Sequence, residues 1–365
     1  ALAWKLAGAR DNPTVWVAPG NDGIEADPEI DGGCVDIAAD DVDELAEFAR
    51  EHSVTLTVVG PEAPLCNGLV DAFESMGLMV FGPTEAAGRR EGSKSFAADV
   101  MTAAGVPTAS HKVFDDMGPA LEYLIDATHP VVIKADGLAG GKGVLISEDV
   151  ETSDKTIREY MEEAKFGEAS QRVVVEEFLQ GTEMSFMVVT DGQEIVPLST
   201  SQDHKRVREG GQGPNTGGMG AFTPSHRATS ELEADLLETV IEPTLAELEK
   251  RGIVYRGFLY AGLMLTEDGP RVLEFNCRLG DPETQALLYA MDRDLGAILT
   301  KAARGNLEGA QDLRTSNAAC CVVLASRGYP GPRDTGFVIE GLDEAATIED
   351  SKIFHAGTRL NERGE

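Results

Sequence analysis

The sequence has little of what marks a secreted or membrane-inserted protein. Its five cysteines form no Cys-x-x-Cys pair, and an odd number scattered through apolar sequence indicates buried, reduced thiols in a cytosolic protein. No apolar run approaches the roughly 20 residues that span a bilayer. We therefore expect a cytoplasmic protein with no membrane partner and no metal bound by cysteine.

Basic residues are also scarce. The chain has 31 lysines and arginines against 63 aspartates and glutamates, a formal net charge of −32. Such a surface repels nucleic acid and anionic membranes, so small molecules are the expected partners and a monomer the expected state. The excess acid indicates a halophilic protein, because concentrated salt screens the self-repulsion of an acidic coat.

The length allows two or three domains with sizeable cores, since 42% of the 365 residues are hydrophobic. The chain begins with Ala1 inside what reads as the middle of a helix, and residues 357–365 form no tapering tail. Both ends look cut, so the sequence predicts a fragment of a longer protein.

Residues 1–90 alternate short apolar strands with helices. The expected elements are strands at 55–59 and 78–81 and helices at 43–52 and 69–76. Continuous apolar strands separated by helices predict a parallel sheet covered on both faces. Ligands bind beyond the carboxyl ends of such strands, where Gly60-Pro61-Glu62 and a second Gly-Pro turn follow.

The pattern changes after residue 104. Expected strands at 131–146, 172–178, 184–190 and 194–199 read as one antiparallel meander. A long acidic helix is expected at 230–251, and a hairpin at 257–265 and 271–275.

A glycine-rich turn at 137–143 follows Lys134 and contains Lys142. Glycines let the backbone approach a polyanion, and two ammonium groups supply countercharge. The spacing is not that of a Walker A loop. An ordinary glycine-rich hairpin with exposed lysines explains the turn equally well.

Two further segments suggest nucleotide and substrate contacts. Glu176-Glu177-Phe178-Leu179 could form an adenine slot, with Glu183 on the ribose, although an edge strand with solvated acids is the simpler interpretation. The polar cluster Asp203-His204-Lys205-Arg206 precedes the glycine-rich segment 210–221, which is either a mobile connection or a substrate loop. His204 is expected to be structural or a hydrogen-bond partner and not a metal ligand, because no other histidine or cysteine lies nearby in sequence.

Glu274, Asn276 and Arg278 lie two residues apart, so on a strand they share one face, while Leu273 and Phe275 point into the core. A carboxylate and an amide oxygen suit Mg²⁺ or Mn²⁺ held chiefly by nucleotide phosphates. The arginine could stabilise a phosphorylated intermediate. A strand with one polar face would show the same alternation.

Taken in order, these motifs resemble the ATP-grasp superfamily, and within it the phosphoribosylamine–glycine ligase family. The motifs that carry the resemblance are Gly60-Pro61-Glu62, Gly92-Ser93-Lys94, Lys134 with Gly140-Gly141-Lys142-Gly143, Glu176-Glu177-Phe178, Gln202-Asp203-His204-Lys205-Arg206, residues 213–219, and residues 274–284. The resemblance implies ATP-dependent ligation of glycine to 5-phosphoribosylamine through a glycyl phosphate, the second step of de novo purine biosynthesis.

The resemblance also implies an α/β architecture. A Rossmann-like parallel-sheet domain would span 1–92, and an ATP-grasp domain 93–305, with a lid subdomain at about 110–180. The start of a truncated, β-rich C-terminal module would span 306–365. The glycine-rich turn with which the family begins is absent before Ala1.

Residue roles follow from the same resemblance. Expected ATP-binding residues are Lys94, Lys134, Gly140, Gly141, Lys142, Glu176, Glu177, Leu179 and Glu183. Expected substrate-binding residues are Gly60, Pro61, Glu62, Asn215, Gly217, Gly218, Met219 and Asp281. Expected catalytic residues are Arg278, Asp203 and Lys205, with Glu274 and Asn276 as ligands of Mg²⁺ or Mn²⁺.

Two rival functions remain. Another ATP-grasp ligase, such as a biotin-carboxylase-like or carboxyaminoimidazole-ribonucleotide-forming enzyme, would lack the glycine-rich segment 213–220. A nucleotide-binding regulatory module would have lost Glu274, Asn276 or Arg278, and all three are present.

The acidic coat generates a stability prediction. Since screening removes repulsion among surplus carboxylates, the melting temperature should rise as KCl is increased into the molar range. Thermal unfolding in a KCl series measures this. A melting temperature that stays flat or falls would contradict the halophilic interpretation.

Overall fold

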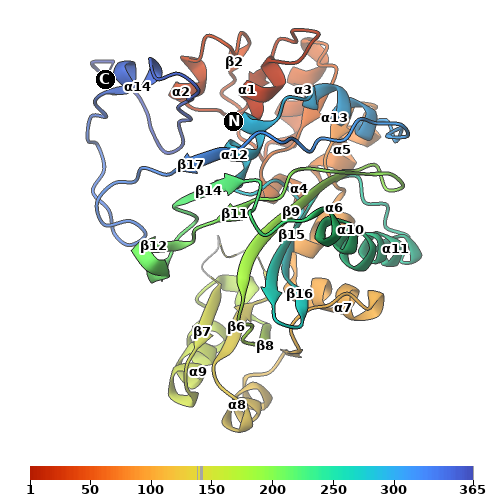
Figure 1. Cartoon of the computed structure of the whole chain (residues 1–365), viewed down its shortest axis with the longest axis vertical. Helices are drawn as coiled ribbons and strands as arrows, with labels where there is room; N and C mark the ends of the chain where they lie inside the picture. Colours follow the sequence, from red (N-terminus) through yellow and green to blue (C-terminus); the bar gives the residue numbers. More distant parts are fainter. Residues whose placement is uncertain (138, 140–142, 365) are drawn as a thin grey trace.

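A computed structural model describes residues 1–137, 139 and 143–364 (Figure 1). The N-terminal region contains two parallel strand pairs, β1 (Trp16–Val17) with β2 (Gly33–Cys34) and β3 (Thr57–Val58) with β4 (Val80–Phe81). Its helices are α1 (Leu2–Ala7), α2 (Asp22–Glu25), α3 (Val42–Glu51), α4 (Glu62–Cys66), α5 (Leu69–Ser75) and α6 (Glu85–Gly92). The expected parallel pairing and helices are confirmed, with shorter strands.

The central sheet has the order β10-β9-β15-β16 and is antiparallel throughout. Its strands are β9 (Thr182–Thr190), β10 (Ile195–Pro197), β15 (Gly257–Thr266) and β16 (Gly269–Asn276). Beside it lie α7 (Lys94–Ala104) and the helical run α10 (Ser230–Leu236), a π-helical turn at Leu237–Ile241, and α11 (Glu242–Lys250). The long acidic helix and the hairpin were therefore predicted correctly.

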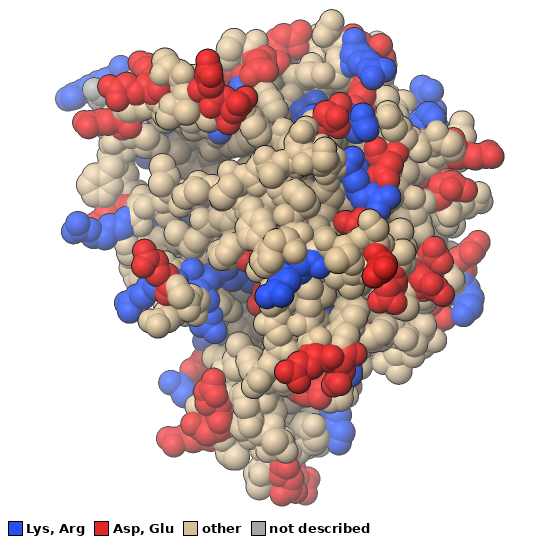
Figure 2. Space-filling model, in the orientation of Figure 1, with Lys and Arg blue, Asp and Glu red and all other residues tan. Residues whose placement is uncertain are grey.

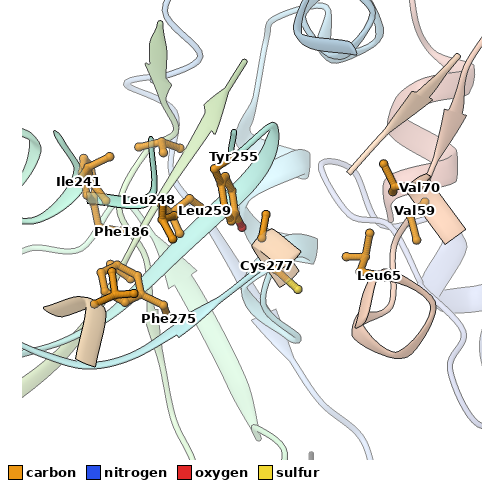
Figure 3. Packing of buried hydrophobic residues seen from close by; sticks show 14 of the residues in the cluster. Val59, Leu65, Val70, Phe186, Ile241, Leu248, Tyr255, Leu259, Phe275 and Cys277 are labelled. Atoms are coloured by element: carbon orange, nitrogen blue, oxygen red, sulfur yellow. The ribbon is translucent and has the colours of Figure 1, made fainter. Parts of the chain in front are cut away.

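The core of this region forms where the sheet meets those helices. Phe186 and Leu259 from the sheet belong to one buried cluster with Ile241 and Leu248 from the helices (Figure 3). All four side chains are fully buried. Burial of this apolar surface stabilises the sheet on which the functional residues are carried.

A second four-stranded antiparallel sheet has the order β5-β8-β6-β7. We call it the lid sheet after the subdomain expected at about 110–180. Its elements are β5 (His111–Phe114), β6 (Val131–Ala135), β7 (Val144–Ser147), β8 (Val173–Glu177), α8 (Met117–Asp126) and α9 (Val150–Ile157), continued by a π-helical turn at Arg158–Glu162. A separate core of residues such as Ile133, Ile157 and Val173 holds it together. Figure 1 shows this unit projecting from the rest of the chain.

The single meander expected over 131–199 was therefore wrong. β8 pairs with β5 and β6, whereas β9 pairs with β10 and with β15, which is distant in sequence. Apolar strand patterns indicate which residues are buried but not which strand lies alongside, and distant pairing is invisible to local periodicity.

The remaining strands form a small sheet of β11 (Gln202–Asp203), β14 (Gly220–Thr223) and β17 (Ala319–Val322), and a hairpin of β12 (Arg206–Arg208) and β13 (Gln212–Asn215). The last helices are α12 (Glu283–Ala290), α13 (Leu295–Ala303) and α14 (Leu342–Ala346), and single 3₁₀ turns occur at Gly167–Ser170 and Glu209–Gly211. β17 pairs with β14, so residues beyond α13 return to the glycine-rich segment.

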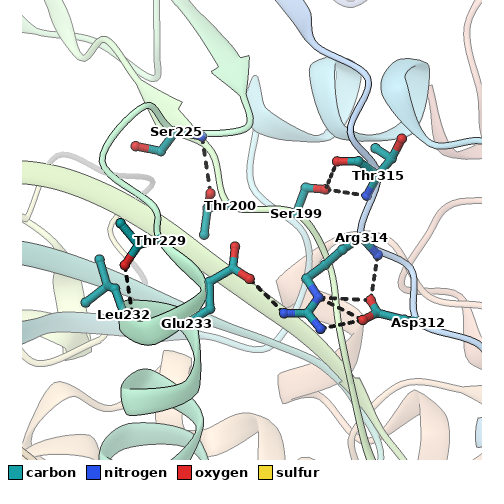
Figure 4. A network of polar contacts seen from close by, with 9 residues as sticks. All are labelled: Ser199, Thr200, Ser225, Thr229, Leu232, Glu233, Asp312, Arg314 and Thr315. Atoms are coloured by element: carbon teal, nitrogen blue, oxygen red, sulfur yellow. Dashed lines mark hydrogen bonds and ion pairs between the residues drawn. The ribbon is translucent and has the colours of Figure 1, made fainter.

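Residues that follow α13 are also fastened to the central region (Figure 4). Arg314 donates to Glu233 of α10 over 2.7 Å, and Ser199 Oγ accepts the backbone N–H of Thr315 over 3.0 Å. Leu313 is fully buried. The segment 312–315 is thus packed against the central region.

The cysteines are distributed between the interior and the surface. All five cysteines are free, but only Cys277 is buried and Cys320 is exposed, so the expectation of burial was wrong for most of them. Among the residues that the structure describes, no helix combines the length and apolarity needed to cross a membrane. Figure 2 shows acidic side chains dispersed over the face in view, with basic ones in small groups among them.

Candidate active site

Strand β16 carries the expected metal pair in an unusual register. Glu274 lies opposite Gly262 of β15, but Val272 lies opposite Leu263, so Leu273 is an extra, unpaired residue in a β-bulge. Leu273 is half-buried and not in the core as expected, whereas Val272 and Phe275 are buried. The carbonyl of this bulged Leu273 accepts a hydrogen bond from Lys134 Nζ over 2.9 Å.

Three expected lysines lie around this strand. Lys134, on β6 of the lid sheet, forms a 2.7 Å ion pair with Glu176 of β8. Lys205 lies 3.9 Å from Glu274 and 3.3 Å from Glu183. Lys94, at the start of α7, donates to the Gly137 carbonyl at the edge of the glycine-rich turn. Residues from the lid sheet, the central sheet and α7 therefore meet at one place.

Charge coupling changes the titration of these groups. Desolvation favours the neutral acid of Glu274, but the positive charges of Lys205 and Lys134 outweigh it and lower its pKa. Burial disfavours the Lys205 ammonium, but Glu274 and Asp203 outweigh that effect and raise its pKa. For Lys94, burial prevails and the pKa falls below its usual value. Glu274 is thus held as an anion beside cations.

Asp203 behaves differently from Glu274. Only 5% of its side chain is exposed, and its nearest cation, Lys205, is 4.0 Å away. Burial, only partly opposed by Lys205, raises the pKa of Asp203 to about 7. The protein therefore holds a carboxyl group at the site that is close to half-protonated at neutral pH.

Arg278 is held from two directions. Its Nε donates to Glu62 over 3.1 Å, and its Nη2 lies 2.7 Å from Glu91. Its Nη1 donates to the Leu279 carbonyl over 3.1 Å. Glu62 follows the Gly60-Pro61 turn, so the arginine joins the N-terminal region to the end of β16.

The acids expected to bind the nucleotide have partners within the chain. Glu176 is paired with Lys134, and Glu183 with Lys205. Glu177 accepts the backbone N–H of Ser110 at the base of the lid sheet over 2.8 Å. Leu179 is half-buried between β8 and β9. Gly140, Gly141 and Lys142 lie outside the described residues.

The expected substrate residues fall into two groups. Gly60 and Pro61 are exposed and Glu62 is bound to Arg278. In the second group, the N–H of Gly217 donates to the Tyr329 hydroxyl over 2.9 Å. Of the remaining members of this group, Gly218 is buried, Met219 is half-buried, and Asn215 and Asp281 are exposed.

Gly218 shows why that segment needs glycine. Its φ is +126°, and a Cβ at this position would lie 2.3 Å from Cδ of Pro282. Both the backbone conformation and the close approach exclude larger residues. The glycine-rich segment therefore packs against residues 281–282, immediately beyond Arg278.

Comparison with known proteins agrees with this arrangement. Residues 1–91, 92–284 and 319–365 match the N, ATP-grasp (A) and C domains of phosphoribosylglycinamide synthetase. The chain belongs to that family.

Relatives support the same conclusion. A phosphoribosylamine–glycine ligase of Allochromatium vinosum is 49% identical over 98% of this chain and 83% of its own length. A phosphoribosylamine–glycine ligase of Escherichia coli is 46% identical over 99% of this chain and 83% of its own length. The crystal structure of the Thermotoga maritima phosphoribosylamine–glycine ligase gives a TM-score of 0.74 at 33% identity, covering 91% of this chain and 79% of that one.

The fold is shared more widely. The biotin carboxylase domain of the Hydrogenobacter thermophilus 2-oxoglutarate carboxylase gives a TM-score of 0.64 at 17% identity, over 87% of this chain and 68% of that one. At that identity the likeness concerns fold alone. The matches to the N and ATP-grasp (A) domains, together with the Thermotoga maritima structure, confirm the expected architecture of an N-terminal parallel-sheet domain followed by an ATP-grasp domain.

Two acids at the site, Asp136 and Glu91, were not predicted from the sequence. Asp136, next to the glycine-rich turn, accepts the N–H of Ser95 over 2.8 Å and its hydroxyl over 2.6 Å. Glu91 accepts the N–H of Cys277 over 2.7 Å. Asp136 directly precedes Gly137, a position that could have drawn notice, whereas Glu91 lies between Arg90 and Gly92 with no local signal of a special role.

The raised pKa of Asp203 generates a prediction about ligand-free protein. The folded chain holds the Asp203 proton more tightly than the unfolded chain does. Proton binding to Asp203 therefore adds to the free energy of unfolding below about pH 4, and this stabilisation is lost as pH rises through 7. The Asp203→Asn variant has a neutral amide at this position, which does not ionise as pH rises. The variant should therefore gain stability relative to wild type between pH 5 and pH 8 in urea unfolding.

A suitable control is Asp99→Asn, which removes a carboxylate whose side chain is 67% exposed. It should show no comparable relative gain between the two pH values. An Asp203→Asn effect that is the same at both pH values would contradict the raised pKa.

Proposed function

We propose that this chain joins glycine to 5-phosphoribosylamine at the expense of ATP, giving glycinamide ribonucleotide, ADP and phosphate. This is the second step of de novo purine biosynthesis. The observation that carries the proposal is the placement of Glu274, Asn276 and Arg278 on and just beyond β16. Lys205, between β11 and β12, lies 3.9 Å from Glu274, and Lys134 of the lid sheet donates to the carbonyl of Leu273 on the same strand. Membership of the family supports the choice of substrates.

The chemistry proceeds in two transfers. A carboxylate oxygen of glycine attacks the γ-phosphorus of ATP, and ADP leaves with the electrons of the broken P–O bond. The amine nitrogen of phosphoribosylamine then attacks the carbonyl carbon of glycyl phosphate, loses a proton, and displaces phosphate. Both steps bring anions together, so they need positive charge where negative charge develops.

Within this proposal, Lys94, Lys134 and Lys142 hold the phosphates together with Gly140 and Gly141. Glu176, Glu177, Leu179 and Glu183 surround the adenosine. The ion pairs that Lys134 and Lys205 make with Glu176 and Glu183 hold these side chains in place before ATP binds. When ATP binds, its phosphates compete with these glutamates for the lysine ammonium groups.

The donor set of β16 fits a hard divalent cation. Glu274 is anionic and 43% of its side chain is exposed, and Asn276 adds an amide oxygen two residues along the strand. Among the described residues no group of three or more His, Cys, Asp or Glu could hold a metal by itself. Mg²⁺ or Mn²⁺ would therefore be held by Glu274, Asn276 and phosphate oxygens, and would supply Lewis-acid stabilisation of the transferring phosphoryl group.

Arg278, Asp203 and Lys205 act next to the reacting groups. Arg278 stabilises the acyl phosphate through its guanidinium. Lys205 places positive charge between the metal carboxylate and Asp203. Asp203, with a pKa of about 7, can accept or return a proton near neutral pH, which suits the amine that must lose one.

The substrates occupy the space bounded by two segments. Gly60, Pro61 and Glu62 form one side, and Asn215, Gly217, Gly218, Met219 and Asp281 the other. We further propose domains at 1–92, 93–305 and 306–365, with a lid at about 110–180. A monomeric, cytoplasmic, halophilic protein with small-molecule partners completes the proposal.

Substrate choice is tested by ADP release. Purified protein with ATP, Mg²⁺, glycine and phosphoribosylamine should form ADP and glycinamide ribonucleotide, and bicarbonate should not replace glycine. Arg278→Ala should keep ATP affinity but lower glycine-dependent ADP release by about 100-fold or more, the usual size for loss of a charge-stabilising donor. Product formation with bicarbonate alone, or unchanged turnover of Arg278→Ala, would overturn the assignment.

The metal assignment has its own test. Glu274→Gln keeps the shape of the side chain but removes the anion, so the Mg²⁺ concentration needed for half-maximal activity should rise by about 10-fold or more. Mn²⁺ binding followed by electron paramagnetic resonance in the presence of ATP gives a readout independent of turnover. Glu267→Gln, in the exposed turn between β15 and β16, is the control. Equal metal affinity in wild type and Glu274→Gln would contradict the site.

A further inference from the structure

Glu91 is a buried carboxylate that has no role in the chemistry described above. It is the penultimate residue of α6, the helix that leads from the N-terminal region into α7, and 7% of its side chain is exposed. Burying an ionisable group is costly unless it is paired and hydrogen-bonded. The contacts of Glu91 show what compensates for that cost.

Both carboxylate oxygens of Glu91 are directed to the residues just beyond the metal pair. Oε1 lies 2.7 Å from Nη2 of Arg278. Oε2 accepts the backbone N–H of Cys277 over 2.7 Å and its thiol over 3.1 Å. One side chain thus holds the backbone that follows Asn276 and the guanidinium that follows it.

The guanidinium retains capacity for a substrate anion. Arginine has five N–H groups. Among the described residues, one contact is made at each nitrogen, to Glu62, Leu279 and Glu91. Beyond these three contacts of the described residues, two N–H groups remain, one on each terminal nitrogen, and their direction depends on how the guanidinium is held.

The two carboxylates on Arg278 are not equivalent. Glu91 is almost fully buried and also binds the backbone of the same strand end. Glu62 has 34% of its side chain exposed and makes a longer contact of 3.1 Å. The geometry points to Glu91 as the residue that sets the orientation of Arg278, with Glu62 as a secondary contact.

We propose that Glu91 is a positioning residue for the ligase reaction: it holds the Arg278 guanidinium, through Nη2 and through the Cys277 backbone, in the orientation that meets the acyl phosphate. This rests on the role proposed above for Arg278. Glu91 itself touches no substrate, so its effect on turnover passes through the arginine.

Glu91→Gln is the informative substitution. The amide has the same shape, but both partners of Glu91 are donors, so the NH₂ group must face either Arg278 or the Cys277 N–H. One contact is therefore lost. We expect kcat to fall by about 10- to 100-fold, the usual range for residues that orient active groups, with little change in the KM for ATP.

A double-mutant comparison separates positioning from a general structural effect. In an Arg278→Ala background, Glu91→Gln should cause no further loss of kcat, because the group it orients is gone. A loss of the same factor in both backgrounds would overturn the proposal. Glu74→Gln is the matched control, since Glu74 is a half-exposed partner of Arg256 at 3.2 Å, and it should leave kcat unchanged.

Thermal unfolding of each variant shows whether it is folded. Should Glu91→Gln not fold, Glu91→Asp keeps the charge and shortens the side chain by one methylene, and it should lower kcat in wild type but not in Arg278→Ala. If Arg278→Ala itself keeps full turnover, the role of the arginine is wrong. If Arg278→Ala loses turnover while the Glu91 variants keep it, the proposed function stands and Glu91 is not a positioning residue.

Discussion

The pairing of β16 with β15, including its bulge, is the constraint on which the site depends. The bulge leaves Leu273 unpaired with β15, and its carbonyl accepts a hydrogen bond from Lys134 of the lid sheet. With the bulge, β16 offers a carboxylate, an amide and a free carbonyl over four residues. The buried cluster of Phe186, Leu259 and the neighbouring helices keeps that strand in place.

The net charge of −32 makes the collection of positive charge at one place a structural problem. Lysines gathered for phosphates repel one another when no nucleotide is bound. Here Glu176, Glu183 and Glu274 lie among them, so charges of both signs are interleaved. The carboxylates proposed to bind nucleotide and metal therefore offset the repulsion among these lysines.

The sequence was most informative where function depends on neighbours in the chain. Glu274 and Asn276 could be assigned to one strand from their spacing, whereas Arg278 lies just beyond the end of that strand. The helices at 43–52 and 230–251 could be assigned from composition. Sheet membership could not be predicted, because β9 pairs with β15 some seventy residues later and local patterns carry no record of that choice. The bulge was missed for a similar reason: an extra residue changes which side chains face the core without changing the residue types.

Glu91 shows a second reason why a site residue cannot be predicted from the sequence. Its sequence neighbours are Arg90 and Gly92, and nothing there distinguishes it from the many surface acids of this chain. Its importance arises only when α6 brings it against residues 277 and 278, which are far away in sequence. Because a buried carboxylate with two fixed donors is costly to misplace, such a group restrains its partners more strongly than an exposed ion pair does. In an acid-rich protein, burial and partners, not residue type, therefore identify the carboxylates that organise the site.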